Sequence, residues 1–424
     1  MNDVFILLEP FNHMLNVIEA AHRRGYDIVT FHTLPIPDEF PEGHPMRLVS
    51  KKCHLSSWVD VDSNLAAVID ACQGRQVVGI YSAAEATLQL DAAIKEHFGL
   101  VGNHPEQVRC FLNKQWVRSE LQKAGLSKLQ YLDEKALRSL QSWDESSAYF
   151  LKPVNGAGSA SVKRCTSLDD IRAAIKNWDE MNDVHLPILR EYMKSGAGIF
   201  LEQAAEGELL SAEGVVYDGE YYPIGLTSRT VLERDPAVEM GCSFPYEHPL
   251  KDKIFETIGA IHNAIGFLHG VTHAELVVTS EGEIELVELN IRFIGLDALT
   301  MVNKACDVNF EDQLVALAVG EQPSMAALAE PKQFISMQYV LAPPNTKTLA
   351  SFEVPGANLV YQRQMKPDGS ELKTTDNQMD HIGCFMVRGD SYEDALANAE
   401  RTRQQVKCNG QSLNSNPNNR VILR

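Results

Sequence analysis

The amino-acid sequence predicts an α/β protein in which a parallel sheet comes first and mixed α and β segments follow. Three observations predict this class. Apolar strands alternate with amphipathic helices over the first hundred residues, a glycine-rich loop lies between two short strands near residue 155, and strands dominate from 206 to about 325. Strands separated by helices imply right-handed crossovers and therefore a parallel sheet.

The composition is that of an ordinary globular protein. The chain has 424 residues, of which 44% are apolar and 22% charged, enough for two or three domains. Its formal net charge of −19 argues against a nucleic-acid or anionic-membrane partner, because such partners require a basic surface. Basic residues can still gather locally around a small phosphate ligand.

The eight cysteines are scattered, with no Cys-x-x-Cys pair and no Cys/His cluster at zinc spacing. This pattern is typical of reduced thiols in a cytosolic protein. The N-terminus, MNDVFILLEP, is acidic where a signal peptide is basic, and no stretch approaches the roughly 20 apolar residues of a membrane span. The sequence therefore predicts a soluble, cytoplasmic protein.

The first expected domain covers residues 1–112. Its strands are expected at 4–8, 27–31 and 77–81, and its helices at 13–24 and 85–98. No Gly-x-Gly-x-x-Gly motif follows the first strand, where Glu9-Pro10-Phe11-Asn12 stands instead. We therefore expect a structural domain that can contribute to a substrate cleft, and no dinucleotide site.

The second expected domain, residues 113–205, is built around the glycine-rich loop. A strand over Tyr149–Pro153 delivers Lys152 to this loop, whose small residues are Gly156, Gly158, Ser159, Ala160 and Ser161. Small residues let backbone N–H groups approach an anion, and a flexible loop can close over a polyphosphate beside the lysine charge. The alternative is an ordinary Gly/Ser turn, which is the commoner structure for such a loop by itself.

The third expected domain, residues 206–330, contains the sequence THAELVVTSEGEIELVELNIRFIG at 272–295, which predicts an antiparallel hairpin. With Glu281 and Gly282 as its loop, Glu275 lies opposite Glu288 and His273 opposite Asn290. Since side chains alternate along a strand, the polar face carries His273, Glu275, Glu288, Asn290 and Arg292. The apolar face carries Ala274, Leu276, Val278, Val287, Leu289 and Ile291.

Two carboxylates directly across a hairpin repel each other. A hard divalent cation removes this repulsion, because Mg²⁺ prefers carboxylate and amide oxygens and commonly completes its shell with phosphate oxygens. The alternative is a solvated outer face. The asparagine and arginine in register with the acids, above a wholly apolar reverse face, favour a metal–phosphate site.

Helices are expected at about 250–265 and 309–319, before a proline-containing boundary that ends at Pro331. The last expected segment, 331–424, contains strands at 334–341 and 383–387 and a helix at 391–407. Its final fifteen residues, rich in Asn and Ser, are expected to be a frayed or partly ordered tail.

Together, the lysine with its glycine loop, a strand ending in Glu, and a later Glu-x-Asn-x-Arg strand resemble the ATP-grasp superfamily. The resemblance covers most of the chain and is strongest in 147–164 and 268–295. Within the superfamily, the stretches GVTHAEL, SRTVLERDPAVEMGCSFP and GCFMVRGDSYEDALANAE are similar to carboxylate–amine ligases that join amino acids, such as bacterial L-amino-acid (dipeptide) ligases and carnosine synthase.

The resemblance implies an ATP-grasp fold for the four segments. Residues 1–112 become the preATP-grasp domain and 113–205 the lid. Residues 206–330 become the large subdomain with the metal site, which the C-terminal α+β segment, 331–424, completes. Glu275, Glu288 and Asn290 then hold two Mg²⁺ or Mn²⁺ ions that bridge the phosphates of ATP.

The resemblance also assigns roles to the basic residues and to the nucleotide-binding strand. Lys114 and Lys152 contact the nucleotide phosphates, although Lys114 by itself is an ordinary lysine on a helix. Arg229 faces the γ-phosphate, and Arg292 stabilises the acyl phosphate and the tetrahedral intermediate. Glu202 reads the adenine amino group, with Ala204 supplying backbone contacts.

Three further positions leave alternatives open. Relatives place a ribose-binding glutamate in a Gly-x-Glu pattern, whereas Gly207-Glu208 places it one position early. Either a local bulge brings Glu208 to the ribose, or the contact is lost. His273 is a candidate base or a partner for a carboxylate, and Glu239, expected in a loop, can bind the ammonium group of an amino-acid substrate.

The implied activity is ATP-dependent formation of an amide bond through an acyl phosphate, with release of ADP and phosphate. The implied partners are small molecules, an amino acid or other carboxylate plus an amine, and relatives are often homodimers. The alternatives within the fold are a biotin-carboxylase-like enzyme and a purine-pathway ligase. The segment 233–239 lacks the Arg/Gln-rich sequence of the former. A non-catalytic nucleotide-binding relative is the alternative of another class.

Overall fold

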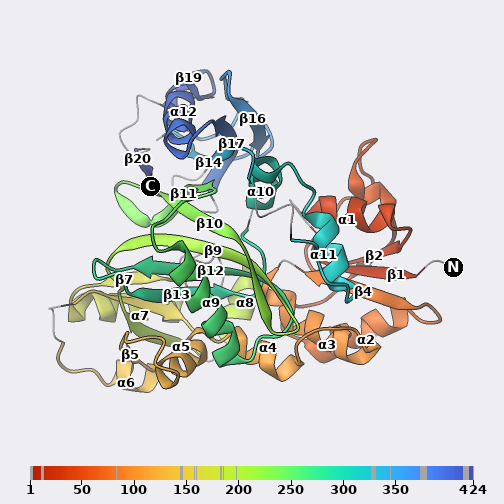
Figure 1. The fold of residues 1–424 in the computed structure, drawn as a ribbon, viewed down its shortest axis with the longest axis horizontal. Helices are drawn as coiled ribbons and strands as arrows, with labels where there is room; N and C mark the ends of the chain where they lie inside the picture. Colours follow the sequence, from red (N-terminus) through yellow and green to blue (C-terminus); the bar gives the residue numbers. More distant parts are fainter. Residues whose placement is uncertain are drawn as a thin grey trace.

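Two bodies of sheet lie along the long axis of the molecule, a small parallel sheet at the N-terminal end and a large antiparallel sheet beyond it (Figure 1). This computed structural model describes the whole chain except residues 1–2, 11–13, 83, 144–146, 157, 159, 182–183, 185, 197, 296, 326–330, 344, 373–379, 414–419 and 424, and the side chains of 235–237 and 423.

The N-terminal sheet is wholly parallel and has the strand order β3-β2-β1-β4. Its strands are β1 Val4–Leu8, β2 Asp27–His32, β3 Val49–His54 and β4 Val77–Ser82. Its helices are α1 Met14–Arg23, α2 Val61–Ala71 and α3 Leu88–Phe98, with short 3₁₀ turns η1 Pro45–Leu48 and η2 Glu85–Thr87. The continuous apolar run of β1 is fully buried because helices cover both faces of a parallel sheet.

The predicted strands of this domain are confirmed, and two elements escaped prediction. The edge strand β3, with the sequence VSKKCH, is mostly exposed and carries lysines, so it lacks the apolar pattern of a buried strand. Helix α2 was also missed. The predicted helix at 85–98 begins as the 3₁₀ turn η2, and its α-helical part ends at Gly99 in the left-handed conformation.

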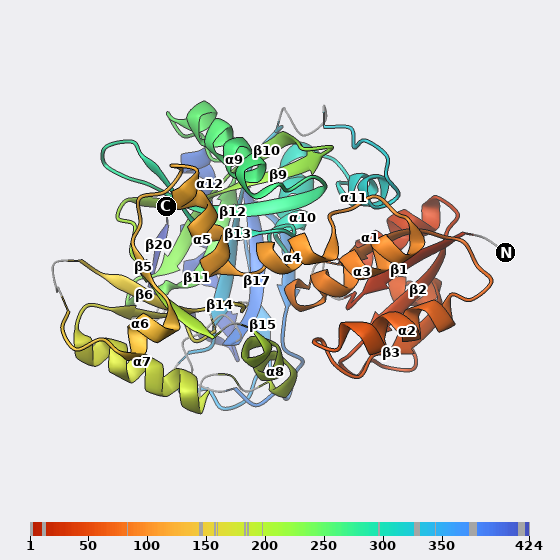
Figure 2. The ribbon, with the colours of Figure 1, turned by 90° about the horizontal axis from the view of Figure 1, so that it is seen from below.

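A separate four-stranded antiparallel sheet has the order β5-β8-β6-β7. Its strands are β5 Tyr131–Leu132, β6 Tyr149–Pro153, β7 Lys163–Cys165 and β8 Ile199–Gln203. Its helices are α6 Glu134–Arg138, α7 Leu168–Glu180 and α8 Pro187–Ser195. Helices α4 Pro105–Phe111 and α5 Lys114–Lys123 precede it and pack in the apolar cluster that contains helix Lys251–Ile265 and the hairpin strands Gly270–Val278 and Ile284–Asn290. Figure 2 shows α8 between this sheet and the N-terminal domain, where Ser57 Oγ donates to Glu191 Oε1 at 3.2 Å.

The large sheet has the order β13-β12-β9-β10-β11-β14-β17-β16, with β20 also paired to β10. Its strands are β9 Glu208–Tyr217, β10 Glu220–Leu232, β11 Asp235–Phe244, β12 Gly270–Val278, β13 Ile284–Asn290, β14 Phe334–Leu341, β16 Leu359–Gln364, β17 His381–Gly389 and β20 Val421–Leu423. The predicted C-terminal segment therefore extends the sheet that carries the hairpin. A small separate sheet contains β15 Phe352–Glu353, β18 Lys407–Cys408 and β19 Gln411–Ser412.

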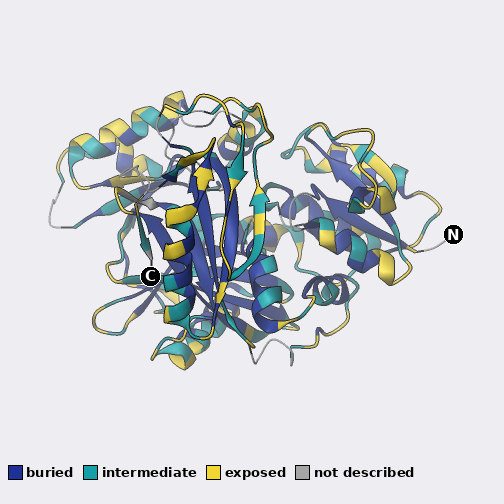
Figure 3. Ribbon diagram, turned by 90° about the horizontal axis from the view of Figure 1, so that it is seen from above, coloured by how far each residue is buried: buried dark blue, intermediate teal, exposed yellow. Residues whose placement is uncertain are grey.

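Helices cover the large sheet and leave its central strands buried (Figure 3). They are α9 Lys251–Ile265, α10 Ala298–Cys306 and α12 Tyr392–Gln405, whereas α11 Glu311–Ala318 packs against α1 and β4 of the N-terminal domain. Ile254, Ile258 and Ile261 of α9 pack against Leu276 and Leu286 of the hairpin. Of these helices, α10 was not predicted.

One expectation for the large sheet is wrong. Glu239 lies in strand β11, paired with Val231 of β10, and not in a loop. The C-terminal tail is partly ordered, which was one of the two expected alternatives, because Val421–Leu423 pair with β10 as strand β20, while 414–419 lie outside the described residues. Over the part of the chain that the structure covers, we find no helix of the length and apolarity needed to span a bilayer.

Candidate active site

The hairpin of β12 and β13 sets Glu275 opposite Glu288 and His273 opposite Asn290, as predicted. The predicted loop is nevertheless wrong. Thr279 N donates to Glu283 O at 2.9 Å, so the loop holds three residues and ends at Gly282 with φ 75°. This shifts the register by one residue, and a bulge at Val287 shifts it back before Glu288.

The bulge also changes the apolar face. Leu286 and Ile284 enter the core beside Leu276 and Val278, whereas the half-buried Val287 does not belong to this apolar cluster. The carbonyl of Val287 instead accepts a hydrogen bond from Lys152 Nζ at 3.4 Å. A β-bulge re-aims side chains at a functional edge, and here it keeps the two carboxylates on one face.

Glu275 is surrounded by residues of the large sheet. Its Oε1 lies 3.1 Å from Arg229 Nη2 and 3.2 Å from His273 Nε2. Arg229 also donates to Glu239 Oε1 through its other terminal nitrogen. Burial by itself raises the pKa of Glu275, but Arg229 and His273 outweigh it and hold this pKa well below its usual range.

His273 is held from behind by Glu213 of β9, which is fully buried. The ring Nδ1 lies 2.8 Å and 3.0 Å from the two carboxylate oxygens. Burial by itself lowers the pKa of His273, but Glu213 and Glu275 raise it to about 9. A protonated ring donates to Glu213 and to Glu275, so this geometry favours a carboxylate partner over a general base.

Glu288 is surrounded instead by residues from other parts of the chain. Lys114 Nζ lies 3.3 Å from Glu288 Oε1 and 3.6 Å from Glu85 Oε1, and it donates to Gly156 O at 2.9 Å. Lys114 is placed by the start of α5, which Asn113 caps by accepting from Trp116 N. Burial raises the pKa of Glu288, Lys114 opposes this, and Glu275 and Glu85 add to it.

The remaining polar residues of the hairpin continue this face. Asn290 is buried, and its Oδ1 accepts from Arg292 Nη2 at 3.1 Å. Arg292 Nη1 donates to the carbonyl of Phe293 at 3.1 Å. The structure thus brings Glu275, Glu288, Asn290 and Arg292 together with the predicted Lys114.

Lys152 and Glu202 form a buried ion pair between neighbouring strands β6 and β8. Lys152 Nζ lies 2.5 Å from Glu202 Oε2, and Arg118 Nε of α5 lies 2.6 Å from Oε1. Burial by itself raises the pKa of Glu202, but Lys152 and Arg118 outweigh it and lower the pKa. Both oxygens of Glu202 are therefore engaged by cations, which the sequence did not anticipate.

The glycine loop runs from β6 towards β7. Gly156 is buried, Gly158 is exposed with φ 63°, Ala160 is half-buried and Ser161 is buried with φ 57°. The predicted Ser159 lies outside the described residues. The contact of Lys114 with the carbonyl of Gly156 ties the loop to the start of α5.

Ala204 and Glu208 were predicted to contact the nucleotide, and in the structure both form hydrogen bonds with other residues of the protein. Ala204 N donates to Ala148 O at 2.9 Å. Glu208 pairs with Val278 with no bulge in the β9–β12 register, so the bulge alternative is not found. Its carboxylate accepts from the hydroxyl of Tyr246 and lies 3.7 Å from His248 Nε2.

Three charged residues of this region were missed by sequence reasoning: Glu85, Arg118 and Glu213. Glu213 lies within the apolar strand β9, where a single acid in a buried run was the available signal. Glu85 and Arg118 lie on ordinary-looking helical segments. Arg118 is distinguished from a surface charge by its contacts with β8 and β13, and Glu85 by its contacts with Lys114 and Arg292.

The side chains of the hairpin alone do not complete the coordination shell of a metal ion. Within the described residues, no three or more His, Cys, Asp or Glu side chains form a group that could hold an ion. Glu275 and Glu288 each have about a quarter of the side chain exposed, 27% and 26%, and Asn290 adds an amide. These residues fit a divalent cation whose remaining ligands are phosphate oxygens and water.

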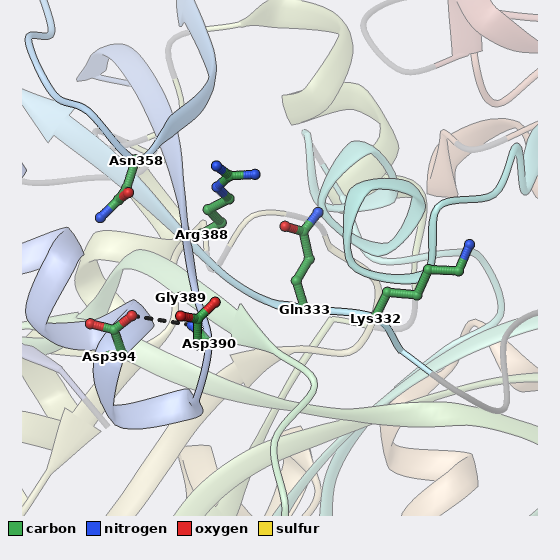
Figure 4. Close-up of a pocket in the computed structure, with 7 residues that line it drawn as sticks. All are labelled: Lys332, Gln333, Asn358, Arg388, Gly389, Asp390 and Asp394. Carbon is green, nitrogen blue, oxygen red and sulfur yellow. Dashed lines mark hydrogen bonds between the residues drawn. The ribbon is translucent and has the colours of Figure 1, made fainter.

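A cavity of about 400 Å³ lies elsewhere, at the start of β14 and the end of β17 (Figure 4). It is lined by Lys332, Gln333, Asn358, Arg388, Gly389, Asp390 and Asp394. Asp390 N, just before the start of α12, donates to Asp394 Oδ2 at 3.1 Å. None of the predicted site residues lines this cavity.

Part of the chain matches the model of a known domain family. Residues 146–300 match the family model of the ATP-grasp domain, and this range includes both the glycine loop and the hairpin. The alanine–anticapsin ligase of Bacillus subtilis strain 168 is 22% identical over 347 residues, which is 74% of this chain and 73% of that protein. An L-arginine-specific L-amino acid ligase of Bacillus subtilis is 20% identical over 250 residues, 58% of this chain and 59% of that protein.

Among solved structures, an L-amino acid ligase from Bacillus licheniformis is similar over 96% of this chain and 98% of its own, with a TM-score of 0.77 and 18% identity. At this identity the likeness describes the fold. It extends over the N-terminal parallel sheet as well as the matched domain.

Proposed function

Because the chain carries an ATP-grasp domain at residues 146–300, we propose that it is an ATP-dependent carboxylate–amine ligase that joins amino acids. Its relatives with similar sequences are named as ligases of alanine with anticapsin and of L-amino acids. The observation that carries the proposal is the paired Glu275 and Glu288, with Asn290, Arg292 and Lys114 on the same face.

The proposed reaction has two steps. A substrate carboxylate attacks the γ-phosphorus of ATP, and ADP leaves to give an acyl phosphate. The neutral amine of the second substrate then attacks the acyl carbon, phosphate leaves, and the amine proton is released. The acyl phosphate is needed because a free carboxylate has no good leaving group.

In this proposal the protein contributes position and charge. Glu275, Glu288 and Asn290 hold Mg²⁺ or Mn²⁺, two ions in our interpretation, and bound metal neutralises charge on the phosphoryl oxygens. Lys114 and Lys152 contact the phosphates, and Arg292 stabilises the oxyanion of the tetrahedral intermediate. The loop around Gly156 and Gly158 excludes water, which otherwise hydrolyses the acyl phosphate.

The proposal assigns Arg229 to holding Glu275 and Glu239, because it contacts both carboxylates and its Nη2 lies 3.1 Å from His273 Nε2 of the same network. Glu202 and Ala204 remain the adenine contacts in this proposal. The adenine amino group must then approach Glu202 beside its ion pairs with Arg118 and Lys152. Glu208 is the ribose contact only if Tyr246 releases it.

The test is phosphate release from Mg·ATP with all pairs of amino acids, followed by mass determination of the product. We expect ADP and phosphate to appear only when both substrates are present, and the product mass to equal the two substrates minus one water. Nucleotide binding without turnover for any pair would leave the non-catalytic alternative. Carboxylated product from labelled bicarbonate would instead support a biotin-carboxylase-like enzyme.

A further inference from the structure

Arg118 lies on helix α5 and is almost completely buried. It is 3% exposed and follows Lys114 by one helical turn on the same face of the helix. Its Nε donates to Glu202 Oε1 of β8 at 2.6 Å, and its Nη1 donates to Ser127 Oγ at 2.8 Å. Its Nη2 donates to the carbonyl of Leu286 in β13. One guanidinium can hold three segments of the chain because its N–H donors are fixed in a plane.

The contact with Ser127 extends to a second carboxylate on β13. Ser127 Oγ donates to Glu285 Oε2 at 2.7 Å, and Lys128 N donates to Glu285 Oε1 at 3.0 Å. Arg118 Nη1 lies 3.9 Å from the same Oε2, and Glu285 is 8% exposed. The segment between α5 and β5 is therefore bound to β13 through one hydroxyl, one backbone N–H and one buried acid.

The part of β13 that Arg118 contacts is the part that carries the bulge. Among the strands that the structure describes, β13 is an edge of the large sheet, so its outer side has no strand to bind its backbone groups. Side-chain donors take two consecutive carbonyls instead. Arg118 donates to Leu286 O, and Lys152 Nζ donates to Val287 O at 3.4 Å. Glu288 follows directly and is back in register with β12, so its position depends on the contacts that hold the bulge.

The same two cations hold the carboxylate of Glu202. Arg118 contacts Oε1, and Lys152 Nζ lies 2.5 Å from Oε2. Glu202 is the residue to which the proposed function assigns the adenine amino group. One buried cluster therefore joins the acid for the base to the strand that carries Glu288, the acid for the metal.

Charge balance alone does not explain an arginine at this position. The cluster contains two cations, Arg118 and Lys152, and two anions, Glu202 and Glu285, so a lysine at position 118 would preserve its net charge. A lysine ammonium is a point charge on a flexible stem and lacks the planar fork that reaches three segments. Since Nε, Nη1 and Nη2 of Arg118 are each engaged by the protein, Arg118 acts through its neighbours and not by contact with a nucleotide.

We propose that Arg118 is a positioning residue for both ends of the nucleotide site: it orients Glu202 towards the base, and it fixes the bulge of β13 that places Glu288 at the metal. The roles of Glu202 and Glu288 in this inference rest on the proposed function. Loss of the arginine fork releases Glu202 Oε1 and Leu286 O together. Base recognition and metal affinity should then fall in the same variant, although Arg118 touches neither ligand.

The experiment measures ligand binding by Arg118→Lys without amino-acid substrates. Mn²⁺ affinity is determined by electron paramagnetic resonance at saturating ADP, and base preference by competition between ADP and inosine diphosphate at saturating Mg²⁺. Inosine diphosphate has a carbonyl oxygen in place of the adenine amino group. We expect Mn²⁺ to bind at least ~10-fold more weakly than in the wild type, as for residues that orient a metal ligand. The preference for ADP should fall at least ~threefold.

Ser127→Ala removes only the hydroxyl that joins Arg118 to Glu285. It should weaken Mn²⁺ binding about two- to fivefold, as expected for one neutral hydrogen bond, and leave the base preference unchanged. Lys123→Met is the matched control, because Lys123 is an exposed cation on the same helix that pairs with Glu120, and it should change neither measurement. Melting temperatures establish that each variant is folded where binding is measured.

Wild-type Mn²⁺ affinity in a folded Arg118→Lys, with only a lower melting temperature, would overturn the inference, because Arg118 would then be a structural cation alone. Weaker Mn²⁺ binding with an unchanged base preference would overturn the link to Glu202. If Arg118→Lys does not fold, unchanged Mn²⁺ affinity in Ser127→Ala overturns the inference.

The ligase assay separates this inference from the proposed function. If amide bonds are formed, Arg118→Lys should lower kcat while the KM values for the amino acids stay within about twofold of the wild type. A wild type that binds Mn²⁺ and ADP but joins no pair of amino acids would contradict the ligase function and leave the binding results valid. A wild type that binds ADP and inosine diphosphate equally would remove Glu202 from the base and overturn that half of the inference.

Discussion

The two carboxylates of the hairpin face each other, yet their surroundings are built differently. Glu275 belongs to a network made by one sheet, in which Arg229, His273, Glu213 and Glu239 come from neighbouring strands β9 to β12. Glu288 faces Lys114 at the start of α5 and Glu85 of the N-terminal domain. One acid is fixed by the sheet, and the other depends on how separate parts of the molecule come together.

The difference also appears in the two pKa values. Arg229 and His273 outweigh burial at Glu275 and lower its pKa, whereas burial dominates at Glu288 and raises its pKa. The charge of Glu275 is stabilised by its surroundings, whereas the charge of Glu288 is incompletely compensated. A cation that binds together with the nucleotide therefore neutralises more uncompensated negative charge at Glu288 than at Glu275.

The largest expected effect is loss of turnover when either acid becomes an amide. Glu275→Gln and Glu288→Gln should each reduce kcat on the order of 10³-fold, because each removes charge that positions the metal. The two variants are expected to differ in their stability at neutral pH. Urea unfolding should show Glu275→Gln less stable than the wild type, because Arg229 and His273 lose their partner, and Glu288→Gln equally stable or more stable.

Reversed stability changes in these two variants would contradict the contrast between the acids. Full activity in either variant would remove that glutamate from the metal site. Glu220→Gln, an exposed glutamate on β10, is the control and should change neither property.

The next effect is on the pH dependence of stability, which tests the Glu275 side alone. The pKa of His273 is raised from 6.5 to about 9 in the folded protein. Its stabilising contribution is fully present below pH 6.5 and is lost as the pH rises through about 9, and it amounts to about 3 kcal/mol at most. The urea midpoint of the wild type should fall over this range, and that of His273→Gln should fall less. Parallel pH profiles would show that His273 is not held protonated.

Glu213 gives a smaller effect, because it acts on Glu275 only through His273. Replacement of a group that orients a metal-binding residue typically costs 10–100-fold in metal affinity. Glu213→Gln should therefore weaken Mn²⁺ binding in the presence of ADP at least tenfold, measured by electron paramagnetic resonance. The KM for ATP should change less than the metal affinity. Unchanged Mn²⁺ binding would separate Glu213 from the site.

The smallest effect concerns strand β20, which pairs with β10 next to Arg229. Val421 packs against the small cluster of Leu232, Val238, Met240 and Leu341. Val421→Ala should reduce the free energy of unfolding by about 1 kcal/mol, with kcat within about twofold of the wild type. A large loss of kcat would mean that β20 positions Arg229 and does not merely cover the edge of the sheet.

Local sequence patterns were enough to predict strands whose apolar residues follow one another within a few positions. The strands at 4–8, 149–153 and 334–341 were predicted with their observed bounds. The pairing of Glu275 with Glu288 was also predicted, although for an incomplete reason. The three-residue loop and the bulge at Val287 shift the register in opposite directions and cancel at Glu288. The misplaced Val287 shows the limit of counting from a turn.

Residues whose role depends on distant partners were not predictable in this way. Glu85 is separated from Arg292 by more than two hundred positions and carries no local signal of its contact. Edge strand β3 and C-terminal strand β20 were missed because hydrogen bonding to a neighbour, rather than apolar alternation, makes them strands.

The sequence by itself determined that acids, an amide and a guanidinium share one face of a hairpin, because side-chain alternation and turn chemistry act over a few residues. Only the tertiary structure decided which charges neutralise them, since Glu213, Lys114 and Glu85 arrive from separate strands and domains. Their ionisation depends on burial and on distances of 3 to 4 Å, and such distances exist only after the sheets and helices have packed.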